Sequence, residues 1–236
     1  MKLKIIADNY TGNKKLKECW GFSVIIGDDI LFDTADSAET FLYNAKQLDV
    51  DLSAIKKVVI SHDHWDHIGG LEALLKINPN ITVYGLPGFS ENFKKLIKKY
   101  GARLEEIDTY HEIADNIFVS GAFSTAYKSG LLQEQALIVK GEEGAAVIYG
   151  CAHPGVVKMI KNIKKSLPGE INLIMGGFHL AQKSSREIKD IIKELKDLGV
   201  KKAAPTHCTG EAAISMFKEA YAHNFIPAKA GMSLTC

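Results

Sequence analysis

Apolar residues along the chain follow two spacings that predict short strands and amphipathic helices in turn. After a strand-like start at residues 1–8, strands are predicted at 22–26, 30–32, 56–60, 81–84, 117–120, 136–139, 145–149, 171–175 and 201–204. Helical spacing is predicted over 38–48, 68–77, 91–100, 156–167, 185–198 and 211–221. A glycine-aspartate turn at 27–29 predicts an antiparallel hairpin between the first two of these strands.

Strands and helices alternate over the whole length, and no Pro-, Gly- or Ser-rich linker separates two halves. We therefore expect an α/β (α+β) fold in a single domain of residues 1–236. Periodicity alone fits sheets covered by helices, but it does not choose between a sandwich and a doubly wound sheet.

Composition narrows the class of protein. Hydrophobic residues make up 46% and charged residues 24% of the chain, which fits a packed globular fold and excludes a disordered or fibrous one. The formal net charge of +1 provides no global field for nucleic acid or an anionic membrane surface. The expected partner is a small-molecule substrate, with no nucleic acid and no membrane, and the sequence does not specify an oligomeric state.

Cysteine usage and the apolar runs indicate a compartment. The four cysteines are scattered without a CxxC pair, which argues against a disulfide framework and against a zinc ribbon. No export signal is evident near residue 1, and no apolar stretch approaches the roughly 20 residues of a membrane-spanning helix. We expect a cytoplasmic protein.

The segment from His62 to His67 carries three of the eight histidines and two aspartates, all of which can donate ligand atoms to a divalent cation. In an extended segment His62 and His64 point to the same side, so both can bind one ion. Asp66 and His67 begin the following helix and can face a second ion. The alternative to metal binding is that these residues are solvated in a loop or cap the helix. So many histidines in one short segment argue against that alternative.

Other histidines follow strands further along. His153 and His207 each come after an apolar strand, and we expect both to complete the metal ligands, because each ion needs about four to six donors. His179 could be a ligand, a substrate contact or a general acid, and we expect it to face the substrate or to support the ligands rather than to bind metal. His111 and His223 are expected to be surface residues.

Three further side chains are candidates with alternatives left open. Cys151 ends a strand and is either a thiolate that bridges two metals or a buried, inert cysteine. Glu134 either supplies a carboxylate ligand or is solvated at the start of a strand. Asp33 is expected to orient the loop through hydrogen bonds rather than to bind metal. Which of Glu134, Cys151 and His153 completes the first metal site stays open.

The spacing His62-x-His64-x-Asp66-His67 resembles the HxHxDH signature of the metallo-β-lactamase superfamily. The resemblance covers nearly the whole chain, with residues 31–34 similar to the first family motif. It implies a four-layer αββα sandwich in which two metal ions lie at one edge between the sheets.

The resemblance extends to His153 and His207, which are similar to the downstream ligands of the superfamily. Segments 150–155, 176–180 and 205–208 resemble a subgroup of metal-dependent hydrolases, some of which resemble an archaeal dihydropterin–ribofuranosylaminobenzene phosphate synthase of methanopterin biosynthesis. There is one departure: Cys151 stands where these hydrolases usually have a bridging aspartate. A clear Gly-His-Thr-x-Gly third motif is also missing.

The resemblance implies two divalent cations, with zinc expected first and manganese, iron or nickel as alternatives. Paired metals would lower the pKa of a bridging water, and the resulting hydroxide would attack a phosphoester or a cyclic ester. Asp66 would hold that hydroxide, and His179 would protonate the leaving group or bind an anion.

Three alternatives use the same residues differently. A pterin-transferring synthase would activate a pyrophosphate leaving group on a pterin. A noncatalytic module would keep the metals without turnover. A flavin-linked diiron protein fits less well, because its usual site has glutamate where His64 stands.

Overall fold

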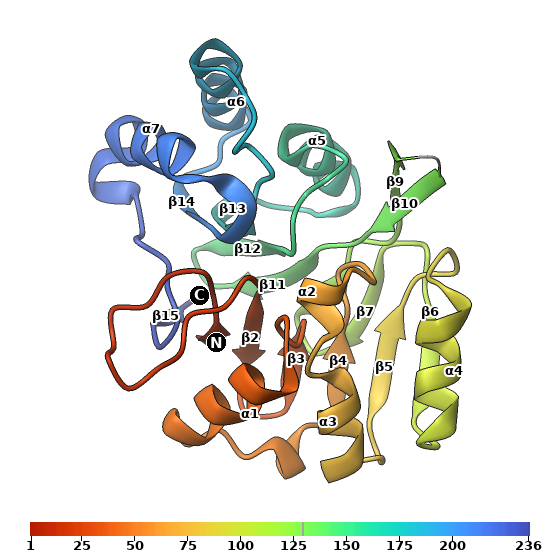
Figure 1. The fold of residues 1–236 in the computed structure, drawn as a ribbon. Helices are drawn as coiled ribbons and strands as arrows, with labels where there is room; N and C mark the ends of the chain where they lie inside the picture. Colours follow the sequence, from red (N-terminus) through yellow and green to blue (C-terminus); the bar gives the residue numbers. More distant parts are fainter. Residues whose placement is uncertain (129) are drawn as a thin grey trace.

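The computed structural model describes residues 1–128 and 130–236, and it contains two large β-sheets that face each other (Figure 1). The first sheet joins strands parallel from β3 through β6 and antiparallel from β15 through β3. Its strands, in spatial order, are β15 (Ser233–Thr235), β1 (Lys2–Ala7), β2 (Ser23–Ile26), β3 (Ile30–Phe32), β4 (Lys57–Val59), β5 (Thr82–Gly85) and β6 (Arg103–Glu106).

The second sheet comes from the later part of the chain. Its strands, in spatial order, are β14 (Lys202–Thr206), β13 (Ile171–Gly177), β12 (Gly144–Tyr149), β11 (Leu137–Gly141), β8 (Ile117–Val119) and β7 (His111–Ala114). The first three are parallel and the others antiparallel. A separate hairpin of β9 (Phe123–Tyr127) and β10 (Gly130–Glu134) projects beyond the sheets in Figure 1.

Helices cover the outer faces of both sheets (Figure 1). On the first sheet lie α1 (Ala38–Gln47), α3 (Leu71–Ile77) and α4 (Glu91–Lys99), and on the second lie α5 (Val156–Ser166), α6 (Ser185–Asp197) and α7 (Glu211–Tyr221). The short helix α2 (Trp65–Ile68) follows β4, and single 3₁₀ turns occur at η1 (Leu52–Ala54), η2 (His207–Thr209) and η3 (Ala222–Asn224). None of the helices formed by the described residues has the length and apolar character that a membrane span requires.

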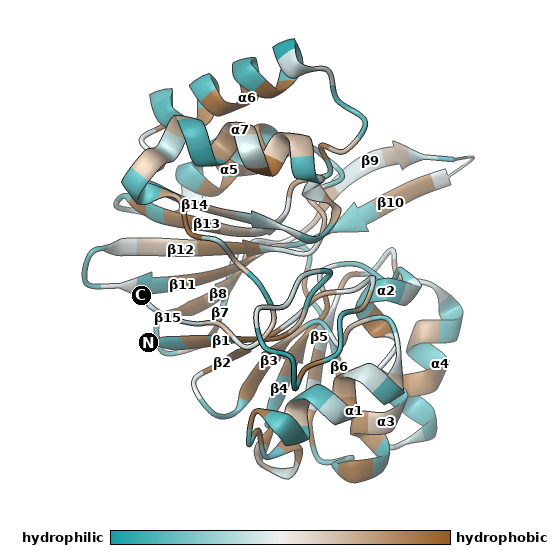
Figure 2. Cartoon of the chain, turned by 60° about the vertical axis from the view of Figure 1, so that its left-hand side comes forward, coloured by the Kyte–Doolittle hydropathy of each residue, from teal (hydrophilic) through white to brown (hydrophobic). Residues whose placement is uncertain are grey.

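Three apolar layers hold the sandwich together, because each strand turns alternate side chains to opposite faces. Between the sheets, Phe32 and Val59 of the first sheet belong to one buried cluster with Val139 and Ile148 of the second. Separate clusters join each sheet to its own helices. In Figure 2 the central strands are coloured mainly as hydrophobic, whereas the helices carry both colours. The predicted four-layer αββα sandwich is confirmed.

The helix predicted over 68–77 is wrong at its start, because the structure has two helices separated at Gly69 and Gly70. The chain passes very close to another segment there: a Cβ added at Gly70 would lie 2.7 Å from Cγ of Phe41 and 2.5 Å from the Thr34 carbonyl oxygen. Only glycine tolerates this approach without displacement of a neighbour. The short helix α2 is thereby held against the loop that follows β3.

Hydrophobic spacing also missed several strands. Strand β6 is largely polar and alternates too weakly for a half-buried strand, and His111, expected in helical or loop surroundings, is the exposed first residue of β7. Glu134, for which a ligand role and a solvated position before a strand were both open, is the fully buried last residue of β10. These elements are defined by pairing with distant segments rather than by local pattern.

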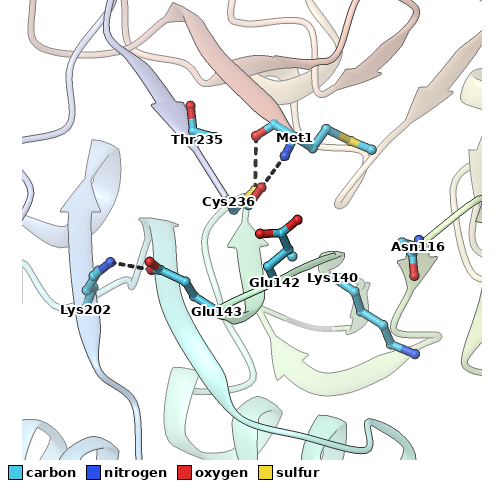
Figure 3. Close-up of a pocket in the computed structure, with 9 residues that line it drawn as sticks. Met1, Asn116, Lys140, Glu142, Glu143, Lys202, Thr235 and Cys236 are labelled. Carbon is cyan, nitrogen blue, oxygen red and sulfur yellow. Dashed lines mark hydrogen bonds and ion pairs between the residues drawn. The ribbon is translucent and has the colours of Figure 1, made fainter.

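A hollow of about 890 Å³ lies where residues 1 and 236 meet (Figure 3). Lys140 and Glu142 line it at the turn between β11 and β12, and Glu143 is paired with Lys202 at 3.2 Å. This turn is at the start of β12, whereas the segment carrying Cys151 follows its end, roughly 20 Å away along a six-residue strand. The hollow is therefore remote from the histidines.

Candidate metal centre

Seven side chains gather into two adjoining groups that could each hold a metal ion. Within each group, one potential ligand atom of every member lies within 4.8 Å of the others. We call the first the histidine group, which consists of His62, His64 and His153. We call the second the mixed group, which consists of Asp66, His67, Cys151 and His207.

The loop from β4 into α2 supplies members of both groups. The rings of His62 and His64 lie 4.6 Å apart between centroids, on the same side of the extended segment. Asp66 and His67, in the first turn of α2, turn toward the mixed group, and His67 lies 4.2 Å from His62. One six-residue segment, His62 to His67, thus contributes potential ligands to two neighbouring groups.

The other members come from the second sheet. His153 lies in the loop after β12, and His207 directly follows β14. These strands are parallel to β13 between them, so their carboxyl ends share one edge of the sheet. That edge faces the β4–α2 loop, which is why residues from distant parts of the chain converge.

A buried carboxylate orients one imidazole of each group. Asp33, just after β3, accepts a hydrogen bond from His67 Nδ1 at 2.7 Å. It also accepts one from the Ser61 hydroxyl at 2.7 Å, and that hydroxyl lies 2.9 Å from His62 Nδ1. We call this Asp33–Ser61 pair the relay. It turns Nε2 of both rings toward the groups, and Asp33 occupies the supporting position expected of it.

Glu134 plays the corresponding part for the loop after β12. Its carboxylate accepts hydrogen bonds from the backbone N–H groups of Cys151, Ala152 and His153, at 2.6 to 2.9 Å. His153 Nδ1 lies 3.0 Å from the same carboxylate. Burial raises the pKa of Glu134, but His153 and these N–H groups outweigh it and lower the pKa overall. Glu134 is therefore an ionised anchor of the loop and lies outside both groups.

Two buried imidazole nitrogens show that the residues fit a metal. His207 Nδ1 lies 2.9 Å from the side-chain oxygen of Asn9, which leaves Nε2 facing the mixed group. Nε2 of His207 and Nε2 of His62 are buried and have no hydrogen-bond partner among the described residues. An unpaired buried nitrogen is costly in a protein interior, and a metal ion would satisfy both atoms.

The two groups differ in charge. Burial and the neighbouring imidazoles lower the pKa of His62 well below its ordinary value, so this ring is neutral. Burial raises the pKa of Asp66, but His207 and His67 outweigh it and lower the pKa to about 2. Burial lowers the pKa of His67, but the Asp33 carboxylate outweighs it and raises the pKa to about 9.

Cys151 lies where the two groups meet. Its Sγ is 3.3 Å from His67 Nε2, and it also forms a third cluster with His153 and His179. Burial raises the pKa of the Cys151 thiol well above its ordinary value, so only a bound cation would favour the thiolate. Cys151 thus occupies a central place. Without it the mixed group would have only three donors.

His179 belongs to neither the histidine group nor the mixed group, but its ligand atom lies within 4.8 Å of those of Cys151 and His153, with which it forms the third cluster. It follows β13, is exposed, and its ring lies 4.4 Å from that of His153. A hydrogen bond with Cys208 raises its pKa. His111 and His223 are exposed and lie outside both groups.

Three residues near the groups had no role in the expectations from sequence. Ser61 precedes the histidine segment and completes the relay. Asn9 follows β1 and reaches His207 across 198 positions of sequence. Tyr127 of β9 packs its ring 4.9 Å from that of His64. Of these three, only Ser61 could have been suspected from the sequence, because it directly precedes His62.

Comparisons with known proteins agree with this fold and arrangement. The family model described as the metallo-β-lactamase superfamily matches residues 21–160. The chain is 31% identical to the 7,8-dihydropterin-6-methyl-4-(β-D-ribofuranosyl)-aminobenzene-5'-phosphate synthase of Methanocaldococcus jannaschii, over 98% of this chain and 95% of that protein.

Solved structures give the same result. Tm1679, a metal-dependent hydrolase of the β-lactamase superfamily, superposes with a TM-score of 0.85 at 29% identity, over 100% of this chain and 99% of that one. The metallo-β-lactamase fold protein YhfI from Bacillus subtilis has a TM-score of 0.72 at 18% identity, with 99% of each chain covered, and supports the fold alone.

The chain belongs to the metallo-β-lactamase superfamily, and it has groups of His, Asp and Cys side chains that could hold metal ions. Within the superfamily it is similar, over nearly its full length, both to a pterin-related synthase and to a metal-dependent hydrolase.

Proposed function

We propose that the protein is a dinuclear metal-dependent hydrolase that cleaves a phosphoester or a cyclic ester of a small molecule with water. One observation carries the proposal: two ligand groups adjoin at Cys151, and each contains a buried imidazole Nε2 without a hydrogen-bond partner. In this proposal the histidine group holds one cation, the mixed group holds the other, and Cys151 lies between them.

Two divalent cations, zinc first among them, would supply Lewis acidity and lower the pKa of a water molecule at the site. Asp66 is ionised, so its carboxylate can accept a hydrogen bond from that water. His179 is exposed beside His153 and can donate a proton to the leaving oxygen. One water is consumed: a phosphoester is split into a phosphate acid and an alcohol, and a cyclic ester is opened to a single hydroxy acid.

Metal analysis combined with turnover tests this proposal. The wild-type protein is purified without added metal, analysed for its elements, and assayed on phosphodiesters and lactones. We expect His64→Ala to lower metal content and turnover together, whereas His223→Ala, an exposed histidine outside the groups, leaves both unchanged. Full metal content with no turnover on any ester would instead favour a noncatalytic metal-binding module.

A second candidate is a synthase that transfers a pterin. The 31% identity to the methanogen synthase over nearly the full length of both chains favours it. The same site would then activate the pyrophosphate of a pterin-methyl pyrophosphate, and the amino nitrogen of an aminobenzene acceptor would form a bond to the methyl carbon, displace pyrophosphate and lose a proton. An assay of pterin pyrophosphate with and without the acceptor separates the two candidate functions. Release of pyrophosphate only when the acceptor is present indicates the synthase. Release of pyrophosphate with water alone indicates the hydrolase.

A further inference from the structure

A hollow of about 450 Å³ opens beside the histidine group. His153 and His179 form the part of its wall that is next to the metal centre, and Val157, Leu180 and Ile191 line it from the second sheet's side. Of the described residues that line it, none is acidic. Its size suits one small molecule, with an apolar portion at one end and a reacting group at the other.

An aromatic side chain on the projecting hairpin also lines the hollow. Tyr127, on the projecting hairpin of β9 and β10, lines the hollow, and its ring lies 4.9 Å from that of His64 and 5.5 Å from that of His153. A molecule that touches the Tyr127 ring is therefore within one ring's width of the histidine group. Aromatic faces bind other planar rings through offset stacking, with centroids about 4.5–7 Å apart.

We infer that the substrate carries a planar aromatic ring, that this ring binds in the hollow against Tyr127, and that Tyr127 selects for it. The inference rests on the proposed metal-dependent function, because the metal centre defines which end of the hollow is reactive. A saturated ring or an acyclic chain fills the apolar end less well, since it offers no flat face to the tyrosine.

Both tryptophans of the chain lie at the metal centre and give a direct readout. Trp20 is 53% exposed, with its ring 5.6 Å from that of His207, and Trp65 is 61% exposed between His64 and Asp66. Phe22, two residues after Trp20, donates its backbone N–H to the carbonyl oxygen of Asp66, the residue after Trp65, at 3.4 Å. We expect a ring bound beside these ligands to change tryptophan fluorescence, and calorimetry measures its binding directly.

The experiment titrates the metal-loaded protein with pterin-6-carboxylate and with cyclohexanecarboxylate, by calorimetry and by tryptophan fluorescence. We expect the pterin to bind and to change the fluorescence, and the saturated acid to bind at least about tenfold more weakly. Tyr127→Leu lowers pterin affinity about tenfold, whereas Tyr127→Phe keeps it. Tyr43→Leu, a matched exposed tyrosine on α1, leaves affinity and turnover unchanged.

Metal content is measured for every variant, so that a damaged metal centre is distinguished from a lost ring site. Val157→Trp fills the hollow from α5 and leaves Tyr127 in place, and we expect it to abolish pterin binding while metal content stays full. Equal affinity for both acids, or unchanged pterin affinity in both Tyr127→Leu and Val157→Trp, overturns the inference. Tighter binding of single-stranded RNA than of pterin overturns it as well.

Turnover assays distinguish a failure of the ring-binding inference from a failure of the proposed function. If metal-dependent cleavage of a ring-free ester proceeds while no ring compound binds, the inference about the ring fails and the proposed function stands. If ring compounds bind but the metal-loaded protein turns over neither esters nor pterin pyrophosphate, the proposed function fails.

Discussion

The histidine group and the mixed group are built from the same loop, yet they differ in composition and in access to solvent. The histidine group has three imidazoles and no acidic donor, and His64 and His153 are half-buried. The mixed group has a carboxylate and a thiol among four donors, all buried. A closed set of four ligands resembles a structural site, whereas three ligands with an open position resemble a catalytic one.

This difference indicates that one group retains its cation tightly and the other gives access to the substrate. Negative donors and burial favour tight retention of a cation in the mixed group. Neutral imidazoles and partial exposure favour exchange and substrate access in the histidine group, which is also the group beside the 450 Å³ hollow. The following predictions test this division, beginning with the largest expected effect.

If two cations bind as proposed, chelation should remove them in two phases. We expect a mild chelator to strip the histidine group first and abolish turnover completely, because that group is more open and lacks a charged donor. The second cation should leave only under harsher treatment. Elemental analysis and turnover, measured on the same samples through the titration, check the order. A single phase in which both cations leave together would show that the groups are equivalent in affinity.

The supporting carboxylates should distinguish the groups. Asp33→Asn disturbs His67 directly and His62 through Ser61, so it should weaken metal affinity in both groups by roughly 10- to 100-fold. Glu134→Gln should weaken mainly the histidine group, because it alters the contact with the His153 ring, whereas Glu134 holds Cys151 of the mixed group only through the backbone N–H. Titration of each apoprotein with zinc measures both affinities.

The matched control is Glu142→Gln, an exposed carboxylate near the chain termini. It should leave both affinities unchanged. If Glu134→Gln weakened the two groups equally, the separation of their supports would be contradicted.

Packing beneath α2 should matter more to the mixed group, because α2 carries two of its members. Gly70→Ala places a methyl group against Phe41 and Thr34, and such overpacking costs about 1–3 kcal/mol of folding free energy. Urea unfolding of the variant measures this loss. Gly130→Ala is the control, since its added methyl would meet no atom within 4 Å.

The smallest effect concerns a buried acid behind His207. Burial raises the pKa of Asp8 to about 7, even though Thr206 Oγ1 lies 2.7 Å from its carboxyl oxygens. Unfolded aspartate has a pKa of about 3.9, so between these values the folded chain keeps a proton that the unfolded chain has lost. Stability of the metal-free protein should therefore fall as pH rises through this window, by about 1.4 kcal/mol per unit.

Asp8→Asn should remove this contribution to the pH dependence. Urea unfolding at pH 5 and pH 6, for wild type and variant, checks it. The same slope in both proteins would assign the pH dependence to other groups.

Local pattern was sufficient for most of the fold. Helix α7 and the hairpin of β2 and β3 occur where apolar spacing and turn residues predicted them, because both depend on neighbours in sequence. The HxHxDH resemblance supplied the layer order, which periodicity could not. Strand β6 was missed because its polar residues are held by pairing with β5.

The supporting residues of the candidate site were harder to anticipate. Glu134 was weighed as a ligand or as a solvated residue, yet it binds the backbone of residues 151–153 from a strand of a different hairpin. Asn9 and His207 meet only because β1 and β14 lie in facing sheets. A nonlocal hydrogen bond leaves no periodic trace in one sequence, so such partners are visible only in three dimensions.

The relay has a thermodynamic consequence. Asp33 serves an imidazole of each group, so a cation that fixes His67 also fixes the carboxylate on which His62 depends through Ser61. Occupancy of one position then changes affinity at the other, and by linkage the influence is equal in both directions. A single buried carboxylate in this way couples the two positions, so that loss of a cation from the histidine group also lowers the affinity of the mixed group for its own cation.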